Sequence, residues 1–454
     1  MDNTTSPSNG ADARVPFRVT EAHKMAAGKI LESALSNHSA WERLALWTDT
    51  FGPRLSGSGA LERAIDWALA ELERDGFANV HGEPVMVPHW VRGEESATLI
   101  APRRAKLSML GLGMSVGTPP AGITAPVLVV STFEELEQRA SEAQGKIVLF
   151  DAPFVSYRET VAYRRRGAVA AAKVGAVACL IRTVASGTIR SPHTGNMAYD
   201  DGVPKIPAAA LSIEDAMLLH RFADRGVPVT VELKMQAQTL PDAPSRNIVA
   251  DLVGSEIPDE VVVFGGHIDS WDVGTGAMDD AGGFMAAWQA LHVIRGLGLR
   301  PRRTIRLVGW TNEENGLRGG VAYRDAHATE IHQHVMAIES DAGFFRPTSI
   351  SFAGDEADVP YMQEIAGLLA SAGPFSAGPG GTGADIRPLM LRGVPTLSLH
   401  SGGDKYMHYH HSHGDMVDKV DPDELAHGVA VLAVYAYILA DMPGRVKGHP
   451  PAQD

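Results

Sequence analysis

Cysteine is nearly absent, because the chain of 454 residues contains only Cys179. A single thiol cannot close a disulfide within the chain, and without partners it cannot build a thiolate metal site. Cys179 lies in the apolar stretch 174–181, so we interpret it as a buried structural thiol. Residues 1–15 are polar and show no apolar signal core after a basic start, which predicts a disordered tail. Together the missing signal and the scarcity of cysteine favour a cytoplasmic location.

Positive charge is also scarce, with 40 Lys and Arg against 54 Asp and Glu and a formal net charge of -14. Such a surface is expected to repel nucleic acid. No apolar run approaches the length of a membrane span, so we expect no membrane partner either. Hydrophobic residues make up 44% and charged residues 21%, which is ordinary for a globular enzyme with more than one domain.

Strand and helix patterns alternate in the second half of the chain. Strands are predicted at 261–264, 304–308, 334–338 and 396–399, and helices at 281–297, 317–328, 360–372 and 423–440. This alternation predicts a three-layer α/β/α fold with a mixed, mostly parallel sheet. In such sheets, ligands bind beyond the carboxyl ends of the strands.

A Gly- and Pro-rich segment at 117–122 is typical of a linker. From there to about residue 238, short strands and helices alternate with few plausible catalytic groupings, and His193 lies in a loop composition that predicts a solvated side chain. We therefore expect a tail at 1–15, one domain built from 16–115 and 240–454, and an inserted domain at 116–239.

Imidazole and carboxylate residues follow four successive predicted strands. Each has an ordinary structural interpretation, such as a helix cap or a solvated first-turn acid. Their joint occurrence at one sheet edge is different, because burying so many carboxylates is costly unless cations neutralise them. The residues concerned are His267, Asp269, Asp279, Glu313, Glu314, Asp341 and a loop with His408, His410, His411 and His413.

Mixed imidazole and carboxylate ligands fit zinc better than calcium or magnesium, which prefer oxygen shells. One bridging carboxylate with two further ligands for each ion would form a two-metal site. Glu313, beside the candidate ligand Glu314, is then free to act as general base on a metal-activated water. Asp269, two residues after His267, is predicted to accept the imidazole N–H.

Other catalytic signatures are missing from the sequence. We find no serine nucleophile elbow, no phosphate-binding loop and no dinucleotide motif after a strand. The Gly-rich stretch 377–383 is interpreted as a substrate-pocket loop, with Thr382 and Asp385 as candidate substrate-binding residues. Arg387 could equally contact substrate or form a surface salt bridge.

Five ordered motifs, at 266–274, 276–283, 312–316, 339–343 and 411–415, carry a family resemblance. Over residues from about 20 to 445 the chain resembles the di-zinc aminopeptidase and glutamate carboxypeptidase family. The resemblance implies that His267 and Asp341 bind one zinc, that Glu314 and His411 bind the other, and that Asp279 bridges them. It also implies that Glu313 is the base and later the acid, and that the peptide bond after Asp279 is cis.

The same resemblance identifies the insert as a protease-associated lid domain of α+β type and implies a homodimer. Many family members have Tyr before the last ligand, where it stabilises the tetrahedral intermediate; here His410 takes that position and, by resemblance, that role. His408, His410 and His413 are rivals of His411 as the ligand.

We therefore expect a two-zinc exopeptidase that hydrolyses dipeptides or short peptides with a free N-terminus. Two alternatives stay open at this point: a catalytically inactive receptor or scaffold on the same fold, and a single-zinc aminoacyl cyclase. The candidate ligands alone do not say which terminus of the peptide is recognised.

Overall fold

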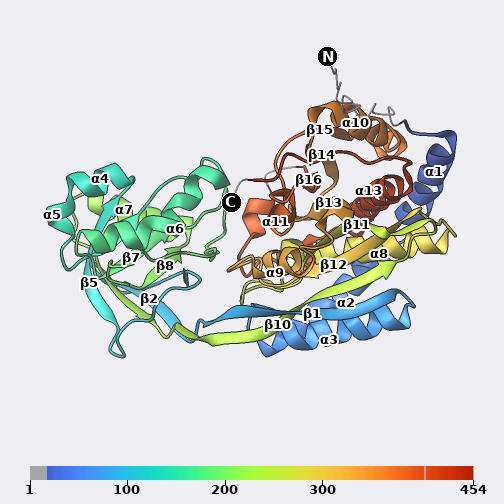
Figure 1. Ribbon diagram of the computed structural model, residues 1–454. Coiled ribbons are helices and arrows are strands. Elements are labelled where there is room, and N and C mark those ends of the chain that lie inside the picture. The colour runs from blue at the N-terminus through green and yellow to red at the C-terminus, as the bar shows by residue number, and fades with distance from the viewer. Residues whose placement is uncertain (1–17, 403–404, 453–454) are drawn as a thin grey trace, which may run out of the picture.

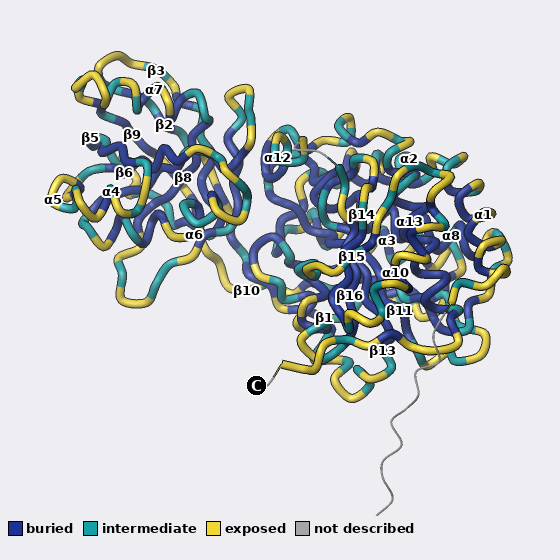
Figure 2. Tube along the Cα trace, turned by 90° about the horizontal axis from the view of Figure 1, so that it is seen from above, coloured by how far each residue is buried: buried dark blue, intermediate teal, exposed yellow. Residues whose placement is uncertain are grey.

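The computed structural model describes residues 18–402 and 405–452, which form two lobes (Figure 1). The predicted tail at 1–15 lies outside the described residues. The first lobe contains residues 18–91 and 238–452, and the second contains residues 95–235. Each lobe has its own buried interior and an exposed rim (Figure 2).

The first lobe is built on an eight-stranded mixed sheet in the order β1-β10-β12-β11-β13-β16-β14-β15. Strands β12, β11, β13 and β16 are parallel to one another. At one side β10 pairs antiparallel with both β12 and β1, and at the other side β14 pairs antiparallel with β16. The prediction of an α/β fold with a mixed sheet is therefore confirmed. The bounds are β1 Ala78–Val91, β10 Gln238–Leu252, β11 Ile257–His267, β12 Arg303–Trp310, β13 His334–Ser340, β14 Pro347–Ala353, β15 Ser376–Pro379 and β16 Thr396–Ser401.

Helices cover both faces of this sheet because alternate strand residues are apolar on both sides. On β11, Val262 and Phe264 join one core and Val261 and Val263 the other. The first core includes α1 Glu21–Leu35, α2 Ser39–Phe51, α3 Gly59–Arg74, α8 Gly282–Gly296, α10 Val359–Gly367 and α13 Pro422–Asp441. The second is closed by α9 Arg318–Ala326 and α11 Arg387–Met390.

Helix α13 is long and apolar enough to cross a membrane, with a mean hydropathy of 1.4 over its most apolar window. The expectation that no apolar run approaches this length is wrong for α13. Its side chains nevertheless pack in the core, where 83% of that window is buried. Such burial is typical of a core helix, and the length and composition of one helix are weak evidence for a membrane span.

The second lobe has another eight-stranded sheet, in the order β3-β2-β9-β5-β6-β7-β8-β4. Helices α6 and α7 pack against opposite faces of it, and Cys179 on β7 is buried as predicted. Because β2, β3 and β4 belong to this sheet, the lobe begins before the predicted boundary at residue 116. The bounds are β2 Glu95–Ala101, β3 Ala105–Leu107, β4 Met109–Gly111, β5 Ile123–Val130, α4 Phe133–Gln138, α5 Ala140–Ala143, β6 Ile147–Phe150, α6 Tyr157–Lys173, β7 Ala178–Arg182, β8 Ala208–Leu211, α7 Ile213–Asp224 and β9 Thr230–Met235.

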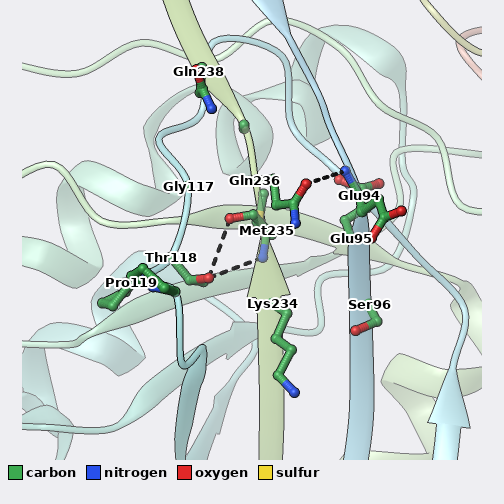
Figure 3. Close-up of a pocket in the computed structure, with 12 residues that line it drawn as sticks. Glu94, Glu95, Ser96, Gly117, Thr118, Pro119, Lys234, Met235, Gln236 and Gln238 are labelled. Atoms are coloured by element: carbon green, nitrogen blue, oxygen red, sulfur yellow. Dashed lines mark hydrogen bonds between the residues drawn. The ribbon is translucent and has the colours of Figure 1, made fainter.

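Two neighbouring stretches of chain join the lobes, one between β1 and β2 and one between β9 and β10 (Figure 3). Gln236 accepts a hydrogen bond from the backbone N–H of Glu94, and Thr118 exchanges hydrogen bonds with the backbone of Met235. A cavity of about 960 Å³ opens at this junction. None of its lining residues belongs to the predicted catalytic set, so this cavity is separate from the predicted site.

Candidate active site

The structure brings the five predicted ligands together at the carboxyl edge of the first sheet. His267 is the last residue of β11, and Asp341 directly follows β13. The Nε2 atom of His267 lies 3.1 Å from Asp279 Oδ1 and 3.8 Å from Asp341 Oδ1. On the other side, His411 Nε2 lies 3.3 Å from Asp279 Oδ2 and 3.0 Å from Glu314 Oε2. Asp279 therefore stands between two imidazole and carboxylate pairs.

Backbone contacts fix the segment that carries Asp279. The peptide bond between Asp279 and Asp280 is cis, as the family resemblance implied. The carboxylate of Asp280 accepts hydrogen bonds from the backbone N–H groups of His267 and Gly283, both at 3.2 Å. The carboxylate of Asp415 accepts from the N–H groups of three consecutive residues, Ala277, Met278 and Asp279. These bonds connect the Asp279 segment to both β11 and the loop that carries His411.

The role predicted for the Asp269 carboxylate needs correction. His267 Nδ1 donates to the backbone carbonyl of Asp269 at 2.9 Å, whereas the nearer carboxylate oxygen is 3.7 Å away. The carboxylate instead accepts from the backbone N–H of Glu313 at 3.0 Å and of Glu314 at 3.4 Å, and from Ser56 Oγ at 3.2 Å. The carboxylate thus orients the Glu313–Glu314 turn, because unpaired backbone N–H groups at a turn are strong donors.

The four histidines of the loop 408–413 differ in burial. His410 and His411 are buried, and their rings stack with centroids 3.6 Å apart, while His408 and His413 are exposed. His410 Nε2 lies 3.5 Å from Asp279 Oδ2. Ligand atoms lie close enough to hold an ion in two groups, one with His267, Asp279 and Asp341 and one with Asp279, His410 and His411.

The donor set fits divalent cations. Burial raises the pKa of Glu313 and Glu314 well above the ordinary value, and it raises the pKa of Asp341 to about 6. Burial alone would disfavour the charge of Asp279, but the facing imidazoles of His267 and His411 hold its pKa well below the ordinary range. Two buried carboxylate oxygens, Asp279 Oδ2 and Glu314 Oε2, lie within 3.3 Å of His411 Nε2 but make no hydrogen bond of good geometry. Buried, unpaired and mutually repelling carboxylates are the pattern that a bound cation neutralises.

A cavity of about 650 Å³ opens over this cluster and is lined by both lobes. Glu313, Asp341 and His410 line it from the first lobe. The second lobe contributes Tyr157, Val161, Arg164, Arg165 and Asn196, and the first also contributes Asp279, Glu314, Gly316, Leu317, Ala342, Tyr406, Met407 and His411.

Two predicted substrate-binding residues, Thr382 and Asp385, do not line this cavity. Asp385 is fully buried, and burial with the neighbouring Glu339 raises its pKa well above the ordinary value. The backbone N–H groups of Asp385 and Ile386 donate to Glu339, so this turn is held against the end of β13. Arg387 is exposed and also lies outside the cavity lining.

Sequence reasoning missed the contribution of the second lobe. Arg164 is buried with its guanidinium 3.3 Å from His411 Nδ1, although it belongs to an otherwise Ala-rich helix. A signal for its burial was available, though not for its contact with His411, since Arg164 falls on the same helical face as Thr160, Gly167 and Ala168, all buried. His193 was predicted to be solvated, but it is buried against the histidine loop, and burial lowers its pKa to about 3. Loop composition does not reveal such a contact between lobes.

Clustered imidazoles and carboxylates at the carboxyl edge of a mixed α/β sheet define a metallohydrolase centre. Residues 247–436 match the model of peptidase family M28. Human carboxypeptidase Q is 51% identical over 407 residues, which cover 90% of this chain and 86% of that relative. Carboxypeptidase Q of Xenopus laevis is 47% identical, with 93% and 90% covered. The chain therefore belongs to peptidase family M28 and is a metallopeptidase.

Solved structures agree with this assignment. A peptidase M28 precursor from Shewanella amazonensis SB2B is 35% identical with a TM-score of 0.91, covering 95% of this chain and 99% of that one. A zinc aminopeptidase from Bacillus subtilis has a TM-score of 0.64 at 18% identity, covering 87% and 94%. The second likeness shows the shared fold alone.

The predicted cytoplasmic location is contradicted by these relatives, since carboxypeptidase Q is a secreted or lumenal enzyme. The prediction rested on two absences, of a signal segment and of cysteine. A fold with large buried cores in both lobes does not need disulfides for stability, so a low cysteine count does not report the compartment.

Proposed function

We propose that this metallopeptidase is a two-zinc exopeptidase that hydrolyses dipeptides or short peptides with a free N-terminus. The observation that carries the proposal is Asp279, whose two carboxylate oxygens face two separate ligand groups. In this proposal His267 and Asp341 hold one zinc, Glu314 and His411 hold the other, and Asp279 is shared. Mixed imidazole and carboxylate donors support zinc over magnesium or calcium.

The chain's own residues account for the proton movements. Zinc ions bound there would polarise the scissile carbonyl and lower the pKa of a water molecule. Glu313 lines the cavity beside the ligand Glu314, and Asp269 holds its backbone, so its carboxylate is placed to take a proton from the attacking water. Glu313 then delivers that proton to the leaving amine. His410 lines the same cavity, and a neutral imidazole can donate one hydrogen bond to the developing oxyanion.

The second lobe supports selection of short substrates. It contributes Tyr157, Arg164 and Asn196 to the lining, so the cavity is lined by a cationic group as well as by carboxylates. A peptide with both termini free has charges of both signs. We propose that this lobe is a protease-associated lid domain and that the enzyme acts as a homodimer without nucleic-acid or membrane partners.

Replacing Glu313 by Gln tests the base. We expect Glu313→Gln to retain its zinc while the peptidase rate falls by about 10²–10⁴-fold, because the amide cannot accept the proton. Zinc content by elemental analysis and turnover of a dipeptide measure the two effects. The matched control is Glu356→Gln, an exposed carboxylate far along the chain, which should leave both unchanged. Peptidase activity near the wild-type rate in zinc-loaded Glu313→Gln would contradict the assignment.

A dipeptide library with N-acetylated and C-amidated controls tests the substrate class. We expect free dipeptides to be cleaved and N-acetylated dipeptides to be spared. Equal rates with and without the acetyl group would overturn the free N-terminus. The same preparation discriminates the alternatives, since one zinc per chain would favour an aminoacyl cyclase, and intact zinc without any cleavage would favour a receptor or scaffold.

A further inference from the structure

Residues 193–194 of the second lobe run alongside the loop that carries His411. The backbone N–H of Thr194 donates to the carbonyl of His411 at 2.9 Å, and His193 and Ser412 form an antiparallel bridge. His411 itself has a φ of 60°, a left-handed conformation that costs about 1 kcal/mol or more for a residue with a side chain. Such a conformation persists only where neighbouring structure holds it, and here the second lobe supplies part of that structure.

The imidazole of His411 meets the same segment. Its Nε2 faces Glu314 and Asp279, so its other nitrogen, Nδ1, faces away from the carboxylates. Two groups lie near Nδ1, the carbonyl oxygen of Thr194 at 3.4 Å and the Nη1 of Arg164 at 3.3 Å. An imidazole that binds a cation through Nε2 carries its proton on Nδ1 and needs an acceptor there. Arginine can only donate, so the carbonyl of Thr194 is the acceptor in reach.

Thr194 is in turn held firmly. Its hydroxyl donates to the carbonyl of Gly111 at 2.7 Å and accepts from Arg92 Nη2 at 3.3 Å. Arg92 makes a two-pronged ion pair with Asp272 of the first lobe, at 2.8 and 2.6 Å. Thr194 is 1% exposed, so these bonds are shielded from water. The chain of contacts from Asp272 through Arg92 to Thr194 therefore ends on the imidazole of His411.

Glu314, the other proposed ligand of the ion that His411 would bind, is also held by residues at the junction between the lobes. The backbone N–H of Trp271 donates to Glu314 Oε1 at 3.2 Å. The Trp271 ring packs on Gly113 of the second lobe so closely that a Cβ at Gly113 would come within 1.9 Å of it. By contrast, His267 donates to the carbonyl of Asp269, within its own lobe.

We propose that Thr194 is a positioning residue for His411, so that the second lobe helps to build one of the two zinc sites as well as covering the cavity. This inference rests on the proposed two-zinc function. It assigns the lobe a role in metal binding that is specific to the ion held by Glu314 and His411.

The test compares Thr194→Val with Thr194→Ser. Valine has nearly the same shape but loses both hydroxyl hydrogen bonds, whereas serine keeps them. Thr194→Val keeps the carbonyl that accepts from His411 and loosens only the segment that holds it, so we expect it to weaken one of the two zinc dissociation constants by about tenfold, the lower end of the range for changes around a ligand. Thr194→Ser should match the wild type. Thr188→Val is the matched control, because Thr188 lies in the same lobe and its hydroxyl donates to Glu214.

Competition with a chelating dye gives the two constants, and cadmium NMR of the substituted protein shows which ion is affected. The resonance lost in His411→Ala identifies the His411 ion, and that same resonance should move in Thr194→Val. Unchanged constants, or equal weakening of both ions, would overturn the inference. If Thr194→Val does not fold by circular dichroism, Arg92→Lys replaces it, since the single nitrogen of lysine cannot replace the three guanidinium nitrogens that bond Asp272, Gly111 and Thr194. A wild-type protein that binds fewer than two zinc ions would instead contradict the proposed function.

Discussion

At the scale of single residues, two acidic residues that are adjacent in the sequence have different roles. Glu314 faces His411, while Glu313 lines the cavity and its backbone is held by Asp269. Asp279 and Asp280 divide in the same way, one facing the two imidazoles and the other accepting backbone hydrogen bonds. In each pair only one carboxylate can face the proposed metal centre, because successive side chains point in different directions.

His334 illustrates a residue whose environment makes stability depend on pH. It is buried beside Tyr323, and burial together with the neighbouring His327 lowers its pKa to about 4. Between its ordinary value of 6.5 and about 4, the unfolded chain binds a proton that the folded chain does not. The contribution of neutral His334 to stability is therefore complete above pH 6.5, and it is lost as the pH falls from 6.5 towards about 4.

When the pH falls from about 7.5 to about 5, we expect the wild type to lose about 2 kcal/mol of unfolding free energy because of His334. His334→Gln should remove that part of the loss, because glutamine does not titrate. Urea unfolding at the two pH values measures the difference. His332→Gln, an exposed change two residues earlier, is the control. An unchanged pH dependence in His334→Gln would show that His334 does not cause the loss.

At the scale of elements, β11 is the strand that delivers the site. It lies between β12 and β13 with helices on both faces, so its end is held on every side. Gly265 and Gly266 precede His267, and neighbouring atoms approach both glycines closely. A Cβ at Gly265 would lie 1.8 Å from the Val308 carbonyl oxygen, and one at Gly266 would lie 2.2 Å from Asp280 Oδ2.

Gly265→Ala is expected to destabilise the protein by about 3 kcal/mol or more, because the clash is with backbone that cannot move aside. Gly296→Ala, in α8, meets nothing within 4 Å and should instead stabilise by about 0.5–1 kcal/mol through helix propensity. Denaturant unfolding of both variants provides the comparison. A small effect of Gly265→Ala would mean that β11 and β12 can separate locally.

At the scale of the whole molecule, the active site lies between two lobes with separate cores. The joining chain segments are short, so contacts at the junction decide how firmly the second lobe is held. The ion pair of Arg92 with Asp272 is the clearest of these, with both side chains mostly buried.

Asp272→Asn should destabilise the protein by about 2–4 kcal/mol, because it removes the two-pronged partner of the buried Arg92 charge and leaves it the longer contact with Glu95, at 3.4 Å. The exposed pair of Asp66 with Arg246 is the matched comparison, and Asp66→Asn should cost less than about 0.5 kcal/mol. Calorimetry would also show whether the lobes of Asp272→Asn unfold separately. Equal effects of the two substitutions would indicate that the junction does not depend on this pair.

Much of the fold and site followed from the sequence by itself. The order of strands and helices in the second half predicted the mixed α/β sheet, and the residues after each strand predicted which side chains share its edge. These predictions succeeded because they depend on local sequence. The hydrophobic periodicity of a segment indicates which of its faces is buried, and the carboxyl ends of parallel strands lie at one edge of the sheet. The compartment could not be obtained in this way, because an absent signal or cysteine carries no positive information.

Only the tertiary structure decided which distant segments meet. Thr194 and His411 are 217 residues apart, and no local pattern in either segment predicts their contact. The same holds for Arg164 at the imidazole, for the burial of His193, and for the Asp269 carboxylate on the Glu313–Glu314 turn. The sequence determined the chemistry of the site because that chemistry is a property of residue types at strand ends. Packing of one lobe against the other determined how those residues are held, because it depends on surfaces that form only after both lobes have folded.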